Sequence, residues 1–342
     1  MNRHQKLLLG TGLAAFLLAA TAGFLYYLLA APAFHPKQTT YIYIDSNDTA
    51  DSVYHKLSLT GQPATLKGIR LLSALKKYNQ HLHTGKYAIR PNDNSWQLFL
   101  RLYRGHQTPV NLTIGSVRTL DRLARQIGQQ LMMDSTAIAG LLQDTLLQRE
   151  MGYTQATLPC LFVPNTYQVY WDMHPRRLIE RLRREHQRFW ETRAQLAADM
   201  GLTPTEVCTL ASIVDEETNY GPEKPTIAGL YLNRLRRGMP LQADPTVKFA
   251  LQDFSLRRIS NEHLLTASPY NTYAQPGLPP GPIRIASAQG IDAVLHYEHH
   301  NYLYMCAKED FSGSHRFAAT YQEHQSNARR YHRALNERRI YK

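Results

Sequence analysis

The longest apolar run of the chain lies near its N-terminus. Residues 7–31 read LLLGTGLAAFLLAATAGFLYYLLAA, 25 positions without a charged side chain. At about 1.5 Å per residue, a helix of this length crosses a hydrocarbon core of roughly 30 Å. A cleaved signal peptide has a shorter apolar centre of about 7–15 residues, although the following AAPAF offers small residues for cleavage. The pattern therefore predicts a single transmembrane helix over residues 7–31.

A short mixed module follows this run. HPKQTT is expected to be a linker, TTYIYI alternates as a strand does, and SNDTADSVYHKL begins with helix-capping residues. KGIRLLSALKKYN, TGKYAIRP, NSWQLFLRLYRG and TPVNLTI continue the pattern. The order strand, helix, helix, strand, helix, strand predicts a compact module over residues 40–112.

The remainder of the chain, residues 113–342, alternates helices with loops rich in proline and glycine. Apolar residues recur at helical spacing in residues 118–150, and a long basic helix, interpreted as a solvated amphipathic helix, is expected in HPRRLIERLRREHQRFWETRAQLAADMG. The loops include LQADPTV and ASPYNTYAQPGLPPGPI, and the last segment, ATYQEHQSNARRYHRAL, is again helical. Loops on a packed scaffold often carry binding groups. The predicted fold class is α+β.

One helix of this region combines an apolar stripe with acids. Thr203, Pro204 and Glu206 form a helix start with a capping box. Glu217 extends the stripe of apolar residues on this helix, whereas Asp215 and Glu216 are rotated away and are expected to be solvated. The stripe consists of Val207, Leu210, Ile213 and Val214. Burial raises the pKa of a carboxyl group, as a general acid near neutral pH requires, but a frayed, solvated helix end would show the same residues.

Charge adds a preference for anionic surroundings. Lysine and arginine number 39 against 27 acids, a formal charge of +12, which suits a membrane surface or an acidic polymer. Zinc-finger spacing and RNP-type aromatic motifs are absent from the sequence, so nucleic acid is not an expected partner. Arg3 and Lys6 precede the apolar run and only Lys37 follows it closely, so residues 1–6 are expected in the cytoplasm. The bulk of the chain would then lie outside.

Several segments resemble the YceG-like family of endolytic murein transglycosylases. The helix LASIVDEET is similar to the family's L-A-S-I-[VI]-E-x-E-[TA] signature, and three further segments resemble its later motifs: YLNRLRRGMPLQADPTVKFAL, SPYNTYAQPGLPPGPI and NYLYMCAKEDFSGSHRF. HTGKYAIRPNDNSWQLFLRLYRG resembles the family's LysM-like module, and FVPNTYQVY its F-P-D-T-Y segment. The chain departs from the pattern at Asp215, often Glu, and at Asn165, often Asp. The first departure favours Glu217 over Asp215 as the catalytic acid.

The resemblance implies cleavage of the β-1,4 bond between MurNAc and GlcNAc in peptidoglycan glycan strands, leaving 1,6-anhydro-MurNAc ends and terminating strand elongation. It implies one catalytic carboxylate, Glu217, and neither a cofactor nor a metal. The helically spaced histidines of HYEHH are therefore expected to be solvated, although such spacing suits a metal. Implied partners are glycan strands, the bacterial inner membrane and the wall-synthesis machinery, with the catalytic domain on the periplasmic side.

The resemblance also places polar residues around the substrate cleft. Each has a structural alternative, because Asp-Pro and Asn-Thr pairs favour turns in any protein. The expected substrate-binding residues are Gln242, Asp244, Tyr270, Asn271, Tyr273, Asn233 and His315. Arg234 is expected to support the site by pairing with a nearby acid. Two other functions remain open: a muramidase that uses Asp244 as its second carboxylate, and a non-catalytic glycan-binding membrane anchor.

Overall fold

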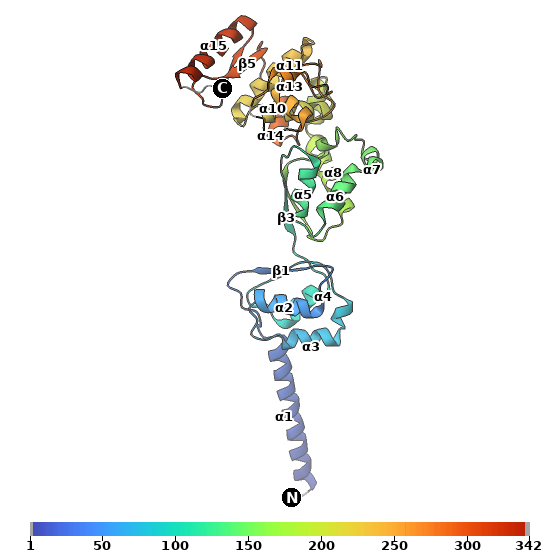
Figure 1. The fold of residues 1–342 in the computed structure, drawn as a ribbon. Coiled ribbons are helices and arrows are strands. Elements are labelled where there is room, and N and C mark those ends of the chain that lie inside the picture. The colour runs from blue at the N-terminus through green and yellow to red at the C-terminus, as the bar shows by residue number, and fades with distance from the viewer. Residues whose placement is uncertain (1–2, 257, 339–342) are drawn as a thin grey trace. The chain divides into compact units, whose positions relative to one another are not determined.

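The computed structural model describes residues 3–256 and 258–338, and the chain forms two compact units (Figure 1). Unit 1 comprises residues 1–112 with 130–132 and 168–173, and unit 2 comprises the remainder. Residues 1–2 of the predicted cytoplasmic tail, residue 257 and residues 339–342 of the predicted catalytic domain lie outside the described residues. Helix and strand are mixed, as the sequence predicts.

Unit 1 begins with the apolar helix α1 (Arg3–Leu29), whose stretch Leu7–Leu29 is long and apolar enough to cross a membrane. The helix ends two residues before the predicted boundary at residue 31. Pro32 disfavours helical backbone at the residue before it, and the N–H groups of Ala30 and Ala31 both turn back to the Tyr26 carbonyl. The helix nevertheless suggests a single-pass membrane anchor.

The rest of unit 1 packs helices against a two-stranded sheet in the predicted order. β1 and β2 are antiparallel, with Thr40 opposite Ile89. Thr49 and Asn94 each complete a capping box at a helix start. The elements are β1 (Thr40–Ile44), α2 (Ala50–Thr60), α3 (Lys67–Leu75), η1 (Tyr78–Gln80), β2 (Gly85–Ile89), α4 (Ser95–Tyr103) and β3 (Val110–Ile114).

The two residues before the predicted linker, residues 35–40, belong to the core of unit 1. Ala33 and Phe34 are buried in the core of unit 1, and both of their N–H groups donate to the Asp93 carbonyl. Phe34 is an aromatic side chain that fits the space between the sheet and the helices. The chain is therefore fixed to the unit almost immediately after it leaves α1.

Unit 2 is mostly helical. β3 pairs with β4, and β5 pairs with β6 in antiparallel register with Tyr304 opposite Ala318. The elements after β3 are α5 (Leu120–Gly128), α6 (Ser135–Gln143), α7 (Thr145–Glu150), η2 (Leu158–Leu161), β4 (Asn165–Val169), α8 (Pro175–Glu191), α9 (Ala194–Asp199), α10 (Pro204–Glu217), η3 (Gly221–Glu223), α11 (Lys224–Arg236), α12 (Asp244–Leu251), α13 (Asn261–Leu264), α14 (Ala288–Leu295), β5 (Tyr304–Ala307), β6 (His315–Ala318) and α15 (Tyr321–Glu337).

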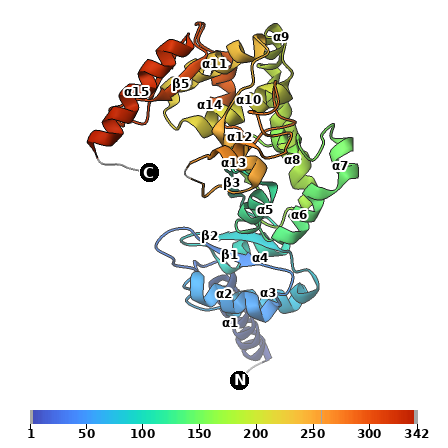
Figure 2. The ribbon, with the colours of Figure 1, turned by 45° about the horizontal axis from the view of Figure 1, so that its top comes forward.

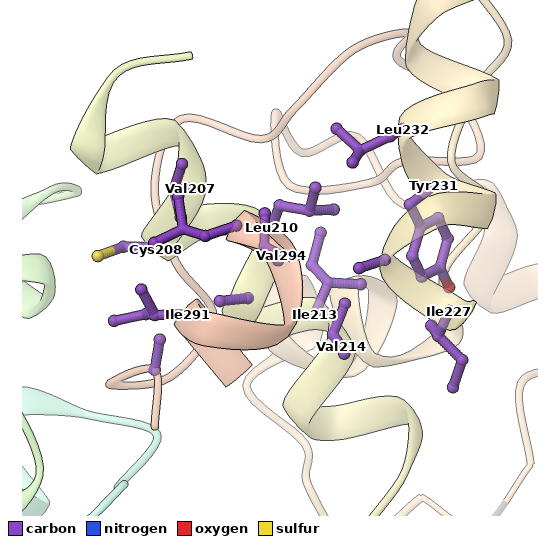
Figure 3. Close-up of a cluster of buried hydrophobic side chains, with 14 of the residues drawn as sticks. Val207, Cys208, Leu210, Ile213, Val214, Ile227, Tyr231, Leu232, Ile291 and Val294 are labelled. Carbon is purple, nitrogen blue, oxygen red and sulfur yellow. The ribbon is translucent and has the colours of Figure 1, made fainter. Parts of the chain in front are cut away.

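Helix α10 lies at the centre of unit 2, where α14, α11 and α12 contact it (Figure 2). Its apolar side chains meet those of α11 and α14 in one cluster that includes Ile213, Tyr231 and Val294 (Figure 3). The predicted start is confirmed: Pro204 takes the first turn, and Thr203 forms a capping box with Glu206. Cys160 and Cys208 are buried free thiols in this core, whereas free Cys306 is partly exposed.

The expectation that Asp215 and Glu216 are solvated is wrong. Every residue from Val207 to Asp215 is buried, and the Glu216 side chain is only 11% exposed, so this stretch of α10 has no solvated side. The periodicity of the apolar stripe identifies one buried side but cannot exclude a second, because a central helix is covered all round. Polar residues on its other side must therefore find partners inside the protein.

Candidate active site

The C-terminal end of α10 opens onto a cavity of about 310 Å³ in unit 2. Glu217 lies in its wall, one turn beyond Ile213 and Val214, as the stripe predicts. The cavity thus brings together residues from α10, α11, α12, β5 and β6. Its polar and sulfur-containing walls are Glu217, Tyr231, Arg234, Gln242, Asp244, Tyr273, Tyr304, Met305, Cys306, His315 and His324.

The carboxyl group of Glu217 is held by one buried tyrosine. The hydroxyl of Tyr231 donates a hydrogen bond to Glu217 Oε1 at 2.6 Å. Tyr231 is 2% exposed and comes from α11, and its ring packs in the apolar core (Figure 3). The pKa of Glu217 is raised to about 7: burial is the largest cause and the charge of Asp244 adds to it, while the Tyr231 hydrogen bond and the charges of His315 and Lys248 oppose the shift. A large fraction of the Glu217 side chains is therefore protonated near neutral pH.

Asp244 faces the same cavity from the first turn of α12. The hydroxyl of Tyr273 donates to Asp244 Oδ1 at 2.6 Å, and both burial and this carboxylate raise the pKa of Tyr273. Asp244 is the first residue of α12, and Pro245, which favours the first turn of a helix, follows it. The site therefore contains a second carboxyl group in addition to Glu217.

Arg234 and Gln242 form another wall. The Arg234 guanidinium donates to Gln242 Oε1 at 2.5 Å and to the carbonyls of Pro240 and Leu303 at 2.9 Å each. Its expected acidic partner is not among these contacts, so that part of the expectation is wrong. Gln242 has a φ of 54°, a left-handed backbone conformation that favours glycine, and its N–H donates to the Thr272 carbonyl. This strained turn places the Gln242 side chain beside the cavity.

His315 lies at the start of β6 and is fixed by Glu223. Its backbone N–H donates to Glu223 Oε1 at 2.7 Å, and its Nδ1 lies 2.8 Å from Glu223 Oε2. Glu223 is 7% exposed, so this contact is shielded from water. With Nδ1 engaged, Nε2 is the ring nitrogen that a ligand in the cavity would meet.

Three predicted substrate-binding residues do not line this cavity. Asn271 is fully buried, and its amide donates to the carbonyls of Leu264 and Thr266, so in this structure the side chain supports its own loop. Asn233 uses its amide to hold the carbonyls of His300 and Tyr302. The Tyr270 ring contacts the Phe249 ring at a tilt of 50°, with centroids 4.7 Å apart, and both residues line a different cavity. Loop motifs place residues near a site, but turn geometry decides which side chains point into it.

Asp215 and Glu216 instead secure the end of α10. Asp215 forms a buried ion pair with Lys224 at 2.5 Å and accepts hydrogen bonds from Ser287, at 2.7 Å from its N–H and 2.9 Å from its hydroxyl. Glu216 accepts two hydrogen bonds of 2.8 Å from Arg118, and Arg284 lies 3.1 Å away. These contacts leave Glu217 as the acid of the three that faces the cavity.

Sequence reasoning did not single out Tyr231 or Glu223. The sequence does contain a hint of Tyr231. The Glu217 carboxyl group on an apolar helix face needs a hydrogen-bond donor, and the next helix offers the tyrosine of its YLN segment, residues 231–233. Glu223 gave no comparable signal, because its partner His315 is far away in sequence. Within residues 3–256 and 258–338, no group of three His, Cys, Asp or Glu side chains is arranged to hold a metal ion. His300 of HYEHH is partly buried, with Nε2 at 2.8 Å from the Thr226 carbonyl.

Comparison with known proteins places the chain in a family. It matches the YceG-like family over residues 42–330 and belongs to that family. It is 38% identical over 133 residues to the endolytic murein transglycosylase of Bacillus subtilis (strain 168), covering 39% of this chain and 36% of that protein. It is 25% identical over 289 residues to the endolytic murein transglycosylase of Streptococcus pneumoniae serotype 2 (strain D39 / NCTC 7466), covering 75% of this chain and 52% of that protein.

A solved structure shares the fold. The crystal structure of the yceG-like protein lmo1499 from Listeria monocytogenes aligns with a TM-score of 0.58 and 22% identity, over 85% of this chain and 99% of that one. The chain spans about half or less of the length of the curated relatives described above.

Proposed function

We propose that this chain is a membrane-anchored endolytic murein transglycosylase with Glu217 as its catalytic acid and base. The observation that carries this proposal is the partly buried Glu217 carboxyl group, whose pKa is raised to about 7 and which faces a cavity lined by hydrogen-bonding side chains. A group that titrates near neutral pH can both donate and accept a proton there. The names of the relatives and the family membership agree with this chemistry.

In the proposed reaction, protonated Glu217 donates its proton to the oxygen of the β-1,4 bond between MurNAc and GlcNAc. The bond from C1 of MurNAc to that oxygen breaks, and GlcNAc leaves with a free 4-hydroxyl group. The 6-hydroxyl of the same MurNAc then bonds to C1 and gives its proton to the Glu217 carboxylate. The products are a 1,6-anhydro end and the regenerated acid, and no water is consumed.

The residues around Glu217 would bind the sugar and would take no part in proton transfer. Gln242, Asp244, Tyr273 and His315 line the cavity and offer hydrogen bonds to hydroxyl and acetamido groups. Arg234 would fix the orientation of the Gln242 side chain. The Asp244 carboxylate is placed to stabilise positive charge that develops on the MurNAc ring.

Asp244 also supports a second candidate, a muramidase. Hydrolysis with two carboxyl groups requires a separation of about 5–5.5 Å for retention or 6.5–9.5 Å for inversion. Asp244 shares the cavity with Glu217 and raises its pKa, so a two-acid mechanism has a structural basis.

Mass spectrometry of the products distinguishes the two candidates. Purified glycan strands would be digested with the full-length protein, and the ends of the fragments weighed. The transglycosylase should leave anhydro ends that are lighter by one water than reducing ends. Reducing ends alone would establish the muramidase, and undigested strands would contradict both.

We place α1 in the bacterial inner membrane with the N-terminus in the cytoplasm, because the basic residues precede the apolar run. The action of the relatives on murein agrees with a periplasmic catalytic unit, since the substrate lies on that side. A reporter fused after Lys342 that is active only outside the cytoplasm should be active. Activity of a cytoplasmic reporter at the same position would reverse the orientation.

We also propose that residues 40–112 form a LysM-like module that holds glycan near the enzyme. The support is the order β1, α2, α3, β2 and a cavity of about 460 Å³ lined by Asp51, Tyr54, Arg70 and Asn79. Replacing Tyr54 with alanine should weaken co-sedimentation of the full-length protein with insoluble sacculi. Unchanged binding to sacculi would show that this cavity of the module does not bind glycan. Contacts with the wall-synthesis machinery remain a further expectation, to be checked by cross-linking in cells.

The Tyr231 hydrogen bond predicts a change in pH dependence. Activity should fall as the pH rises through about 7, because protonated Glu217 is the donor. The Tyr231 hydroxyl stabilises the ionised form, so Tyr231→Phe should raise the Glu217 pKa and move this alkaline limb to higher pH. Tyr167→Phe, which loses only a hydrogen bond to the Val163 carbonyl, is the control and should leave the profile in place. If the alkaline limb of the pH profile stays in place in Tyr231→Phe, a group other than Glu217 controls the loss of activity at high pH.

A further inference from the structure

The outer end of α1 is fixed to one face of unit 1. Leu28 is only 8% exposed, and the Asn94 amide donates to the Ala30 carbonyl at 3.1 Å. A Cβ atom on Gly68 of α3 would lie 2.2 Å from the Leu28 carbonyl oxygen, so glycine permits the close approach. Figure 1 shows α3 beside the end of α1. Because Phe34 then enters the core, this end of the anchor is held rigidly against α3 and α4.

The side of α3 that touches the anchor continues as exposed leucines. Gly68, Leu71 and Leu75 are spaced by three and four residues, so they lie along one side of the helix. Leu71 is 36% exposed and Leu75 is 70% exposed. Ile69 and Leu72 are buried in the core of unit 1, so the core does not account for this second apolar stripe. The stripe begins at the point where α1 ends and extends along α3 away from it.

Residues next to this stripe suit a boundary between lipid and water. Trp96 is 44% exposed and follows Ser95, whose side chain lies against Gly68. Lys67 precedes the stripe, and Lys76 and Lys77 follow it, all three exposed. Tryptophan is enriched where membranes meet water, and lysines near the membrane surface are attracted to anionic headgroups.

From this arrangement we propose that α3 lies on the outer surface of the membrane that α1 spans. The membrane-contact surface consists of Lys67, Leu71, Leu75, Lys76, Lys77 and Trp96. Its occupant is the bilayer itself, because the rigid junction at Gly68 holds the stripe at the level where the anchor leaves the hydrocarbon. Leu71, Leu75 and Trp96 enter the headgroup region, and the lysines meet lipid phosphates, as in an interfacial amphipathic helix. The proposal rests on the anchor and is independent of the catalytic activity.

Depth-dependent fluorescence quenching tests this contact. The full-length chain would be reconstituted in vesicles of phosphatidylcholine and phosphatidylglycerol whose acyl chains carry bromine either near the headgroups or at the bilayer centre. Trp96→Phe identifies the share of emission that comes from position 96, since Trp171 and Trp190 also emit. We expect the shallow bromines to quench most of the Trp96 emission and the deep bromines to quench little.

The combined variant Leu71→Asp and Leu75→Asp should abolish that quenching, because carboxylates do not enter the lipid boundary. Leu265→Asp, at an 83% exposed leucine of unit 2, is the matched control and should leave the quenching unchanged. Thermal unfolding checks that the variants are folded, and Leu71→Gln with Leu75→Gln replaces the aspartate pair if that pair unfolds. Trp96 emission that neither bromine position alters, or quenching that persists in the folded double variant, would overturn the proposal.

Discussion

Glu217→Gln should lower cleavage of glycan strands by at least about 10²–10⁴-fold, the usual contribution of general acid–base catalysis. Glutamine keeps the shape of the side chain and can still accept the Tyr231 hydrogen bond, but it cannot give a proton to the glycosidic oxygen. The measurement is the rate at which anhydro-ended fragments are released from purified strands. Near-normal turnover would remove Glu217 from the mechanism.

The stability of the same variant separates lost chemistry from lost folding. Because the pKa of Glu217 is raised from 4.5 to about 7, its ionisation opposes folding increasingly as the pH rises through that interval. Glutamine carries no such charge, so Glu217→Gln should unfold at a higher temperature than the natural protein at pH 8, and the difference should shrink toward pH 4. An inactive variant that is also less stable at pH 8 would point to misfolding instead.

Asp215→Ala should destabilise the protein by roughly 3–5 kcal/mol, the usual effect of removing one partner of a buried ion pair. The change leaves Lys224 buried without its carboxylate and removes the acceptor for both Ser287 hydrogen bonds. Urea unfolding, followed by circular dichroism, measures the loss.

The matched control is Glu150→Ala, which breaks an exposed ion pair with Arg176 and should cost about 0–1 kcal/mol. Equal effects of the two changes would contradict the structural role of Asp215. Stability measurements also separate the structural role of Asp215 from the catalytic role of Glu217, because Asp215→Asn should lose activity together with stability. Glu217→Gln should lose activity alone.

Much of the architecture follows from local pattern. The order of strands and helices in unit 1, the Thr203 cap of α10 and the placement of Glu217 at the end of its apolar stripe are predictable because each depends on neighbouring residues. The anchor is predictable for the same reason, although its last turn was set too far by two residues. Pro32, a local signal, accounts for this boundary, and the N–H groups of Ala30 and Ala31 turn back to the Tyr26 carbonyl.

The arrangement of the site depends on contacts between distant segments. Asp215 was expected in water because a single helix cannot reveal that Lys224 and Ser287 cover its other side. The resemblance places the loop of Asn271 at the substrate cleft, yet the Asn271 amide donates to the carbonyls of Leu264 and Thr266 inside that loop. Recognition of motifs therefore located the region, and only the fold distinguished side chains that face the cavity from those that support it.

The burial of α10 from Val207 to Asp215 limits which positions of this chain can change. From Val207 to Asp215 each side chain has neighbours on all sides, so a change of volume at any of these positions disturbs packing. We therefore expect the sequence of the helix that carries Glu217 to change slowly during evolution. If the chain has the proposed function, we expect new substrate preferences to arise at Gln242, at Tyr273 and in β5, whose side chains line the cavity and are less buried.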